Sequence, residues 1–231
     1  MNAPRFAVSL MCMDFANVAE QISALNKHAD SFHLDVMDGH FAPNLALSPD
    51  WISAIVPYTK IRTEVHLMAD EPERWIEPLA HAGVDIISPH VETIHNDAFR
   101  IMNRIKENGC RTGLVLNPLT PFEEVKLLLP RVDLLTFMSV DIGFAGQSFI
   151  DEVLPKIRQA VEFREREGLN YEIQIDGHCF EGTYKKVRES GADTFIVGNA
   201  GLFNLSKDVD EAWSLMLDTY ERATGEKVDR K

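Results

Sequence analysis

The feature that most constrains the fold of this chain is a regular alternation between short apolar runs and longer amphipathic stretches. The eight apolar runs are predicted as strands: Phe6–Leu10, Ser31–Val36, Arg62–Leu67, Asp85–His90, Arg111–Leu116, Leu134–Val140, Tyr171–Asp176 and Thr194–Val197. The eight stretches that follow them are predicted as helices: Asp14–Lys27, Pro49–Pro57, Pro72–Ala82, His95–Asn108, Pro121–Leu129, Ser148–Glu167, Phe180–Ser190 and Asp208–Ala223. Strict alternation of strand and helix implies a parallel sheet, because each helix returns the chain to start the next strand.

Two architectures satisfy this alternation, a closed (β/α)8 barrel and an open doubly wound sheet. Eight units in 231 residues fit one barrel, so we expect residues 1–231 to form a single TIM-barrel domain. An open sheet of the dinucleotide-binding kind would want a glycine-rich turn after its first strand. The first predicted strand is instead followed by Met11-Cys12-Met13, which contains no glycine. The barrel is therefore the favoured fold.

The charge and cysteine content restrict the partners and the compartment. Lys and Arg number 23 and Asp and Glu number 36, giving a net charge of −13. This balance argues against nucleic acid and anionic membranes as partners, but not against a small phosphorylated molecule. Three widely spaced cysteines do not form a disulfide framework. With no secretory segment and no apolar run of roughly 20 residues, we expect a cytoplasmic protein.

In a barrel the chemistry lies at the carboxyl ends of the strands, so those positions are the ones to inspect. His33 and Asp35 share one face of the second predicted strand, because residues two apart on a strand point the same way. His66 ends the third strand and Asp176 ends the seventh. Two imidazoles and two carboxylates form a ligand set that suits Zn²⁺, Mn²⁺, Fe²⁺ or Co²⁺. The alternative is that each is a hydrogen-bonded structural residue.

Asp35 and Asp176 also suit acid–base catalysis. They lie on the second and seventh of eight strands, so their carboxylates can face one ligand from nearly opposite sides. This geometry allows one carboxylate to remove a proton from a carbon and the other to return a proton to the opposite face. A metal between them would polarise a neighbouring carbonyl and stabilise the enediolate that forms.

Glycine-bearing turns at the same end of the barrel indicate a phosphate site. Gly143, Phe144, Ala145 and Gly146 follow the sixth strand, Gly177 and His178 follow the seventh, and Gly198 and Asn199 follow the eighth. Glycine lets backbone N–H groups approach an anion, and barrel phosphate sites typically use the loops after strands 7 and 8. The alternative is that these glycines only form turns.

Four methionines, Met11, Met37, Met68 and Met138, lie at or just beyond strand ends. They could simply pack in the core. Alternatively, they form a polarizable apolar lining that keeps water away from an enediolate.

These motifs resemble those of the ribulose-phosphate 3-epimerase family, and the match runs in order from about Ser9 to Phe203. The matching segments are HLDVMDGHFAPN (His33–Asn44), EVHLM (Glu64–Met68), ISPHVE (Ile87–Glu92), LVLNP (Leu114–Pro118), GFAGQ (Gly143–Gln147) and IDG (Ile175–Gly177). The first two are highly specific.

The resemblance implies a ribulose-phosphate-binding TIM barrel with one divalent metal ion on His33, Asp35, His66 and Asp176. The ion would be Zn²⁺, Fe²⁺, Mn²⁺ or Co²⁺, with Mg²⁺ as a further option. The resemblance also implies a homo-oligomer, either a dimer or a hexamer, that acts on a small phosphorylated ketose. It implies Asp35 and Asp176 as the acid–base pair. We expect the substrate contacts at Ser9, Met37, His66, Met68 and Met138, and the phosphate contacts at Gly143, Phe144, Ala145, Gly146, Gly177, His178, Gly198 and Asn199.

Within the family, the chain resembles the D-allulose-6-phosphate 3-epimerase branch. The cues are Leu10–Asp14, Phe163–Leu169, Gly201–Phe203 and Asp210–Trp213. The favoured substrate pair is therefore D-allulose 6-phosphate and D-fructose 6-phosphate, with D-ribulose 5-phosphate and D-xylulose 5-phosphate as the alternative.

The chain departs from the family pattern at Ile142, His178 and Asn199, all of which flank the expected phosphate site. We hypothesise that His178 donates a hydrogen bond to the phosphate or narrows the pocket. The alternative is that its side chain points into solvent.

Two other functional classes compete with an epimerase. A Schiff-base aldolase needs a lysine at a strand end, and none of the eight predicted strand ends has one. A metal-dependent aldolase remains an alternative because it also stabilises an enediolate. A non-catalytic phosphosugar sensor is the third class, although sensing alone would not require two opposed carboxylates.

Overall fold

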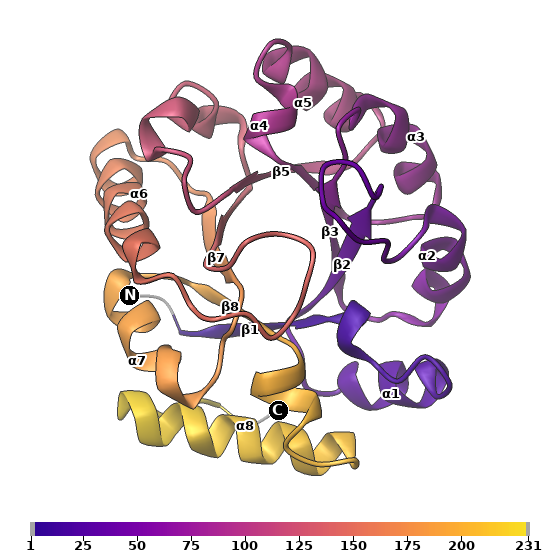
Figure 1. Ribbon diagram of the computed structural model, residues 1–231, viewed down its shortest axis with the longest axis vertical. Coiled ribbons are helices and arrows are strands. Elements are labelled where there is room, and N and C mark those ends of the chain that lie inside the picture. Colours follow the sequence, from indigo (N-terminus) through magenta and orange to yellow (C-terminus); the bar gives the residue numbers. More distant parts are fainter. Residues whose placement is uncertain (1–2, 230–231) are drawn as a thin grey trace.

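The computed structural model describes residues 3–229, and within them the strands close into a parallel barrel in chain order (Figure 1). The strands are β1 (Arg5–Ser9), β2 (Ser31–Met37), β3 (Arg62–Met68), β4 (Ile86–Pro89), β5 (Arg111–Leu116), β6 (Leu134–Met138), β7 (Glu172–Asp176) and β8 (Thr194–Val197). β8 pairs with β1, which closes the ring. The predicted (β/α)8 barrel is confirmed.

Helices surround the barrel on its outside (Figure 1). They are α1 (Val18–Leu25), α2 (Pro49–Ile55), α3 (Glu73–His81), α4 (Val91–Ile94), α5 (Ala98–Glu107), α6 (Leu154–Glu167), α7 (Glu181–Ser190) and α8 (Val209–Thr224). Among residues 3–229, no helix has the length and apolarity that crossing a bilayer requires.

Besides the helix expected at His95–Asn108, which begins at Ala98 after the unpredicted short helix α4, three of the predicted helices differ from the structure. The first begins at Val18 rather than Asp14, because the Asp14 carboxylate accepts bonds from the Ala16 N–H and the Asn17 side chain and forms a turn instead. The stretch predicted as Pro121–Leu129 contains a short 3-10 turn, η3 (Phe122–Val125), and a second, η4 (Leu129–Arg131), that includes Pro130. Proline lacks the N–H that would continue an α-helix.

The third difference lies next to the expected phosphate site. α6 begins at Leu154 rather than Ser148, after the 3-10 turn η5 (Asp151–Val153). The loop that follows β6 is therefore longer than predicted, and in Figure 1 it arches across the mouth of the barrel. Asn44 Nδ2 donates to the Gly143 carbonyl at 2.8 Å, which ties this loop to the loop after β2.

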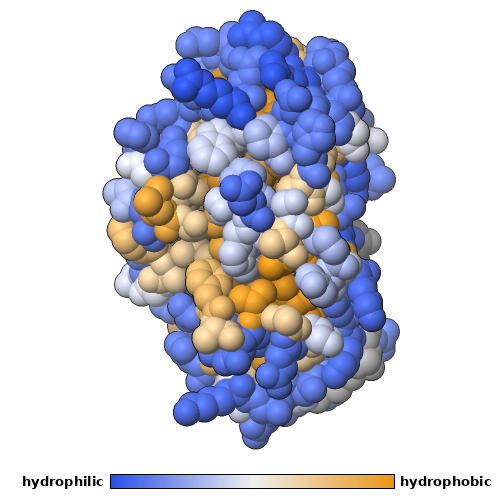
Figure 2. Space-filling model, turned by 90° about the vertical axis from the view of Figure 1, so that its right-hand side faces the viewer, coloured by the Kyte–Doolittle hydropathy of each residue, from blue (hydrophilic) through white to orange (hydrophobic). Residues whose placement is uncertain are grey.

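The core lies between the outer face of the barrel and the helices. Where β1 and β8 meet α7 and α8, aromatic rings pack edge to face: Phe6 and Tyr220 have centroids 5.1 Å apart, and Tyr184 and Tyr220 have centroids 5.3 Å apart. The flank seen from the right of Figure 1 carries apolar side chains between two polar regions (Figure 2). The chemistry-bearing strand ends lie away from this core, inside the barrel mouth.

The amino-terminal end of the barrel is closed by ion pairs. Glu172, the first residue of β7, accepts bonds of 2.8 and 3.0 Å from the two terminal nitrogens of Arg62, the first residue of β3. Arg5 lies 3.2 Å from the same carboxylate, and the Thr194 hydroxyl also donates to it. Glu172 is 8% exposed. This end therefore serves stability and leaves the opposite end free for chemistry.

Candidate active site

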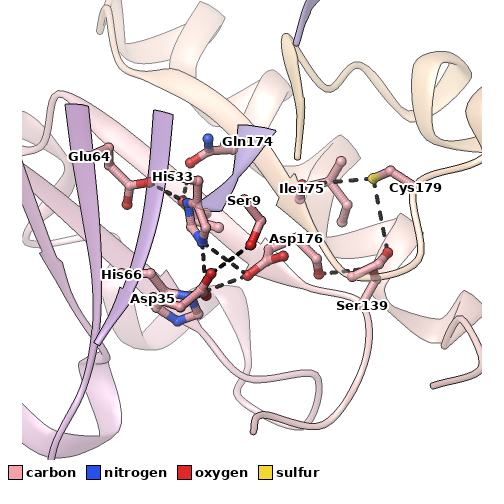
Figure 3. A network of polar contacts seen from close by, with 12 residues as sticks. Ser9, His33, Asp35, Glu64, His66, Ser139, Gln174, Ile175, Asp176 and Cys179 are labelled. Atoms are coloured by element: carbon pink, nitrogen blue, oxygen red, sulfur yellow. Dashed lines mark hydrogen bonds and ion pairs between the residues drawn. The ribbon is translucent and has the colours of Figure 1, made fainter. Parts of the chain in front are cut away.

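The four predicted metal ligands converge inside the barrel mouth (Figure 3). One ligand atom from each of His33, Asp35, His66 and Asp176 lies within 4.8 Å of all the others. His33 Nε2 is 3.2 Å from Asp35 Oδ1 and 3.4 Å from Asp176 Oδ2. His66 Nδ1 is 3.4 Å from Asp35 Oδ1 and 3.2 Å from Asp176 Oδ2. The strand register explains this, because Asp35 pairs with His66 across β2 and β3.

The residues present fit a divalent cation. His33 Nε2 and His66 Nδ1 are buried, point at the two carboxylates and have no hydrogen-bond partner. Buried polar nitrogens are normally hydrogen-bonded, so two such atoms that face the same carboxylates indicate a missing partner. Two imidazoles and two carboxylates also form the mixed nitrogen and oxygen set that Zn²⁺, Fe²⁺, Mn²⁺ and Co²⁺ accept.

The electrostatics of the cluster keep both aspartates ionised. Burial acts to lower the pKa of His33, but the charges of Glu64 and then Asp35 outweigh it and raise this pKa well above its usual value. Burial acts to raise the pKa values of Asp35 and Asp176, yet the charge of His33 holds both below their usual range. Both carboxylates are therefore anionic and suited to hold a cation.

Glu64 is a buried carboxylate that the sequence reasoning did not single out. Its Oε2 lies 2.5 Å from His33 Nδ1, the nitrogen that faces away from the two aspartates (Figure 3). A carboxylate at this place fixes the ring orientation of a metal-ligating imidazole. The signal was available, since Glu64 lies two residues before His66 and so faces the same side of β3.

Ser9 lies where the resemblance implies, at the carboxyl end of β1 beside the aspartates. Its hydroxyl donates to Asp35 Oδ2 at 2.7 Å, so it orients that carboxylate (Figure 3).

A pocket opens above the cluster. Every residue predicted to contact substrate or phosphate lines it: Ser9, Met37, His66, Met68, Met138, Gly143, Phe144, Ala145, Gly146, Gly177, His178, Gly198 and Asn199. Met37, Met68 and Met138 are buried and pack on apolar neighbours, so they belong both to the lining and to small apolar clusters.

The loop after β7 has an unusual backbone. Gly177 has φ +116, and a Cβ there would lie 2.8 Å from Val140 Cγ2, so only glycine fits. His178 has φ +49 and is the one non-glycine residue with a left-handed backbone in the chain from 3 to 229. Its ring stacks on Phe180 with centroids 4.4 Å apart, and its Nδ1 is buried without a hydrogen-bond partner. Residue 178 therefore lines the pocket, and its ring packs on Phe180.

Comparisons with known proteins agree with this geometry. The model of the ribulose-phosphate 3 epimerase family matches residues 5–203. The ribulose-phosphate 3-epimerase of Synechocystis sp. is 44% identical over 202 residues, which cover 86% of this chain and 86% of the relative. The Bacillus subtilis enzyme of the same name is 39% identical over 198 residues, which cover 85% and 91%.

Solved structures share the fold at low identity. A tryptophan synthase complex from Pyrococcus furiosus matches with a TM-score of 0.64 at 12% identity, over 97% of this chain and 100% of that one. Such identity supports the barrel alone. The family match covers most of the chain, and the relatives exceed a third in identity over most of both lengths. The chain therefore belongs to the ribulose-phosphate 3-epimerase family.

Proposed function

We propose that the chain is a metal-dependent 3-epimerase that interconverts D-ribulose 5-phosphate and D-xylulose 5-phosphate. Membership of the family makes it an isomerase that acts on a sugar phosphate. The observation that carries the proposal is the pair of carboxylates, Asp35 from β2 and Asp176 from β7, which line one pocket and converge on the imidazoles of His33 and His66.

The pentulose phosphate replaces the hexulose phosphate expected from the sequence. Relatives that are 44% and 39% identical carry the name ribulose-phosphate 3-epimerase. The cues for the hexulose branch at Phe163–Leu169 and Asp210–Trp213 lie on or beside α6 and α8 and do not line the pocket. The other two cues, Leu10–Asp14 and Gly201–Phe203, do contribute Met11, Cys12 and Gly201 to the pocket. The relatives carry the pentulose name, so the D-allulose 6-phosphate preference has no support from them.

In the proposed reaction, one aspartate removes the proton on C3 and the other delivers a proton to the opposite face. Ser9 orients Asp35 through its 2.7 Å hydrogen bond, which leaves Oδ1 of that carboxylate toward the cluster. When bound, a divalent ion would polarise the C2 carbonyl and stabilise the enediolate. Met37, Met68 and Met138 keep water from the reacting carbons, because apolar side chains cannot hydrogen-bond it.

The loops after β6, β7 and β8 would hold the phosphate through their backbone N–H groups. His178 adds a side chain to this set, since the residue lines the pocket and its Nδ1 has no hydrogen-bond partner. We expect His178→Ala to raise KM several-fold with kcat little changed, because the phosphate is remote from the reacting carbon. Unchanged KM and kcat would remove the functional role of the imidazole.

Turnover in D₂O tests the function. The metal-loaded protein is assayed on D-ribulose 5-phosphate and D-allulose 6-phosphate, and NMR follows deuterium at C3. We expect deuteration at C3 and a higher kcat/KM for the pentulose phosphate. A higher kcat/KM for the hexulose phosphate would overturn the proposed substrate. Turnover without C3 deuterium would overturn proton transfer at that carbon.

Substitution tests whether each aspartate acts in proton transfer, and a surface control shows whether a mutation lowers activity by disturbing the fold. Asp35→Asn and Asp176→Asn should each lower kcat by about 10²–10⁴-fold, the usual contribution of a positioned acid or base. Metal content is measured for each variant. Asp50→Asn, on the exposed start of α2, is the matched control and should retain turnover. If either pocket variant keeps wild-type kcat, the two-base proposal fails.

The aldolase and sensor hypotheses have less support than the epimerase hypothesis. No lysine is among the described residues that line the pocket, so nothing there supports a Schiff-base aldolase. Family membership also argues against a metal-dependent aldolase and a non-catalytic sensor. The homo-oligomer that the sequence resemblance implies stays a prediction, which light scattering would test.

A further inference from the structure

A chain of buried polar groups continues from His66 away from the proposed metal site. His66 Nε2 lies 2.8 Å from His90 Nε2, and His90 Nδ1 lies 3.0 Å from Glu92 Oε2. Both imidazoles are fully buried, and their rings stack with centroids 4.9 Å apart. The three residues come from β3, from the residue after β4 and from α4. Neither His90 nor Glu92 lines the substrate pocket.

At the far end of this hydrogen-bonded series, the Glu92 carboxylate can only accept hydrogen bonds. Glu92 Oε1 accepts the Asn117 N–H at 2.9 Å and the Thr120 hydroxyl. An ionised carboxylate only accepts, so the proton between Glu92 and His90 belongs to His90 Nδ1.

The near end is fixed by the ligand geometry. His66 Nδ1 faces Asp35 and Asp176 and must offer a lone pair to a cation there. A neutral imidazole with a bare Nδ1 carries its proton on Nε2. His66 Nε2 therefore donates to His90 Nε2, which is the bare nitrogen of a His90 whose proton is on Nδ1. With this assignment, each contact between His66, His90 and Glu92 pairs one donor with one acceptor.

We propose that Glu92 and His90 form a positioning relay that holds His66 in the tautomer and ring orientation needed to bind the metal. This inference rests on the metal site of the proposed function. It gives the two ligand imidazoles different supports: Glu64 holds His33 directly at 2.5 Å, whereas Glu92 holds His66 through a second imidazole. Partners of this kind commonly change metal affinity by about 10–100-fold when removed.

A purely structural role is the competing explanation. Glu92 braces the loop after β5 through Asn117 and Thr120, and the His90 ring packs against Phe41 with centroids 4.8 Å apart. The test must therefore remove the relay and keep the packing. His90→Phe keeps an aromatic ring between Phe41 and His66 but has no acceptor nitrogen. Thr120→Val is the matched control, because it weakens the loop brace and leaves the Glu92–His90 bond in place.

The measurement is Zn²⁺ affinity by competition with a chromophoric chelator, made on the whole chain after metal removal. We expect His90→Phe to weaken Zn²⁺ binding by about 10–100-fold and Thr120→Val to leave it within about threefold. Equal weakening in the two variants, or no weakening in His90→Phe, overturns the relay. A wild-type protein that binds no divalent ion refutes the proposed metal-dependent function and the relay together. A wild type that binds Zn²⁺ while His90→Phe binds it equally well refutes the relay alone, so the two failures are distinguishable.

A measurement on the wild type covers the case in which His90→Phe does not fold. ¹⁵N NMR of the Zn²⁺-loaded protein reports which nitrogen of each histidine carries a proton. The relay requires His90 to be protonated on Nδ1 and bare on Nε2, and His66 to be protonated on Nε2. A His90 that carries its proton on Nε2 overturns the proposal.

Discussion

Replacing Glu172 with glutamine should make the protein less stable at neutral pH but less sensitive to acid. Burial acts to raise the pKa of Glu172, but hydrogen bonding and charge from Arg62, with smaller contributions from Thr194 and Arg5, lower it below its usual value of 4.5. A carboxylate with a lowered pKa in the folded state stabilises the fold above its unfolded pKa. That stability is lost as the pH falls through the folded value.

The magnitude follows from the contacts at the amino end of the barrel. Glu172 receives two hydrogen bonds from Arg62, and its side chain is nearly buried. Hydrogen bonds to charged groups contribute about 1.5–3 kcal/mol, so Glu172→Gln should lower the free energy of unfolding by about this amount near neutral pH. Below about pH 4.5 the wild type loses this contribution, and the difference between the two proteins should narrow.

Urea unfolding followed by circular dichroism at about pH 7 and about pH 3.5 measures the difference. Glu123→Gln is the control: its partner is Lys126, three residues on, and such an exposed pair contributes little to stability because solvent screens it. The reasoning is refuted if Glu172→Gln and wild type differ equally at both pH values. It is also refuted if Glu172→Gln matches the control at neutral pH.

Three further outcomes are expected. Gly113→Ala should destabilise the fold by about 1–3 kcal/mol or more in urea unfolding, since a Cβ there would lie 1.9 Å from Ser88 Oγ. Lys156→Met should speed amide hydrogen exchange in the loop after β5. The reason is that Lys156 Nζ donates at 2.7–3.0 Å to three carbonyls of this loop, those of Asn117, Pro118 and Thr120. Exchange at the wild-type rate would contradict this. Adding Zn²⁺ at 100 times its dissociation constant should stabilise the fold by about 2.7 kcal/mol, visible as a higher melting temperature; an unchanged melting temperature would argue against the metal site.

The sequence was sufficient for the barrel and for the convergence of His33, Asp35, His66 and Asp176. Alternating segments determine a parallel sheet, and in a closed ring all strand ends meet at one mouth. The α-helix expected at Pro121–Leu129 was wrong, because this stretch forms short 3-10 turns, and amphipathic spacing alone does not separate a 3-10 turn from a turn of α-helix.

The hydrogen-bond partners of the buried polar groups could not be predicted from the sequence, for a different reason. His90 is the last residue of the predicted strand Asp85–His90, but its contact with His66 depends on ring orientations across two neighbouring strands. Periodicity assigns residues to a face and does not pair them. The preference for the hexulose phosphate stays without support, and two of its cues, Phe163–Leu169 and Asp210–Trp213, lie on or beside helices outside the barrel.

The left-handed backbone at His178 has a consequence for redesign of the pocket. A residue with φ +49 already follows a path that glycine adopts freely, and asparagine and aspartate tolerate it better than other residues. Changes among these residues should leave the course of the loop unaltered while they exchange the group offered to the ligand. A small library of Gly, Asn, Asp and His at this one position would therefore sample ligand preference separately from scaffold shape.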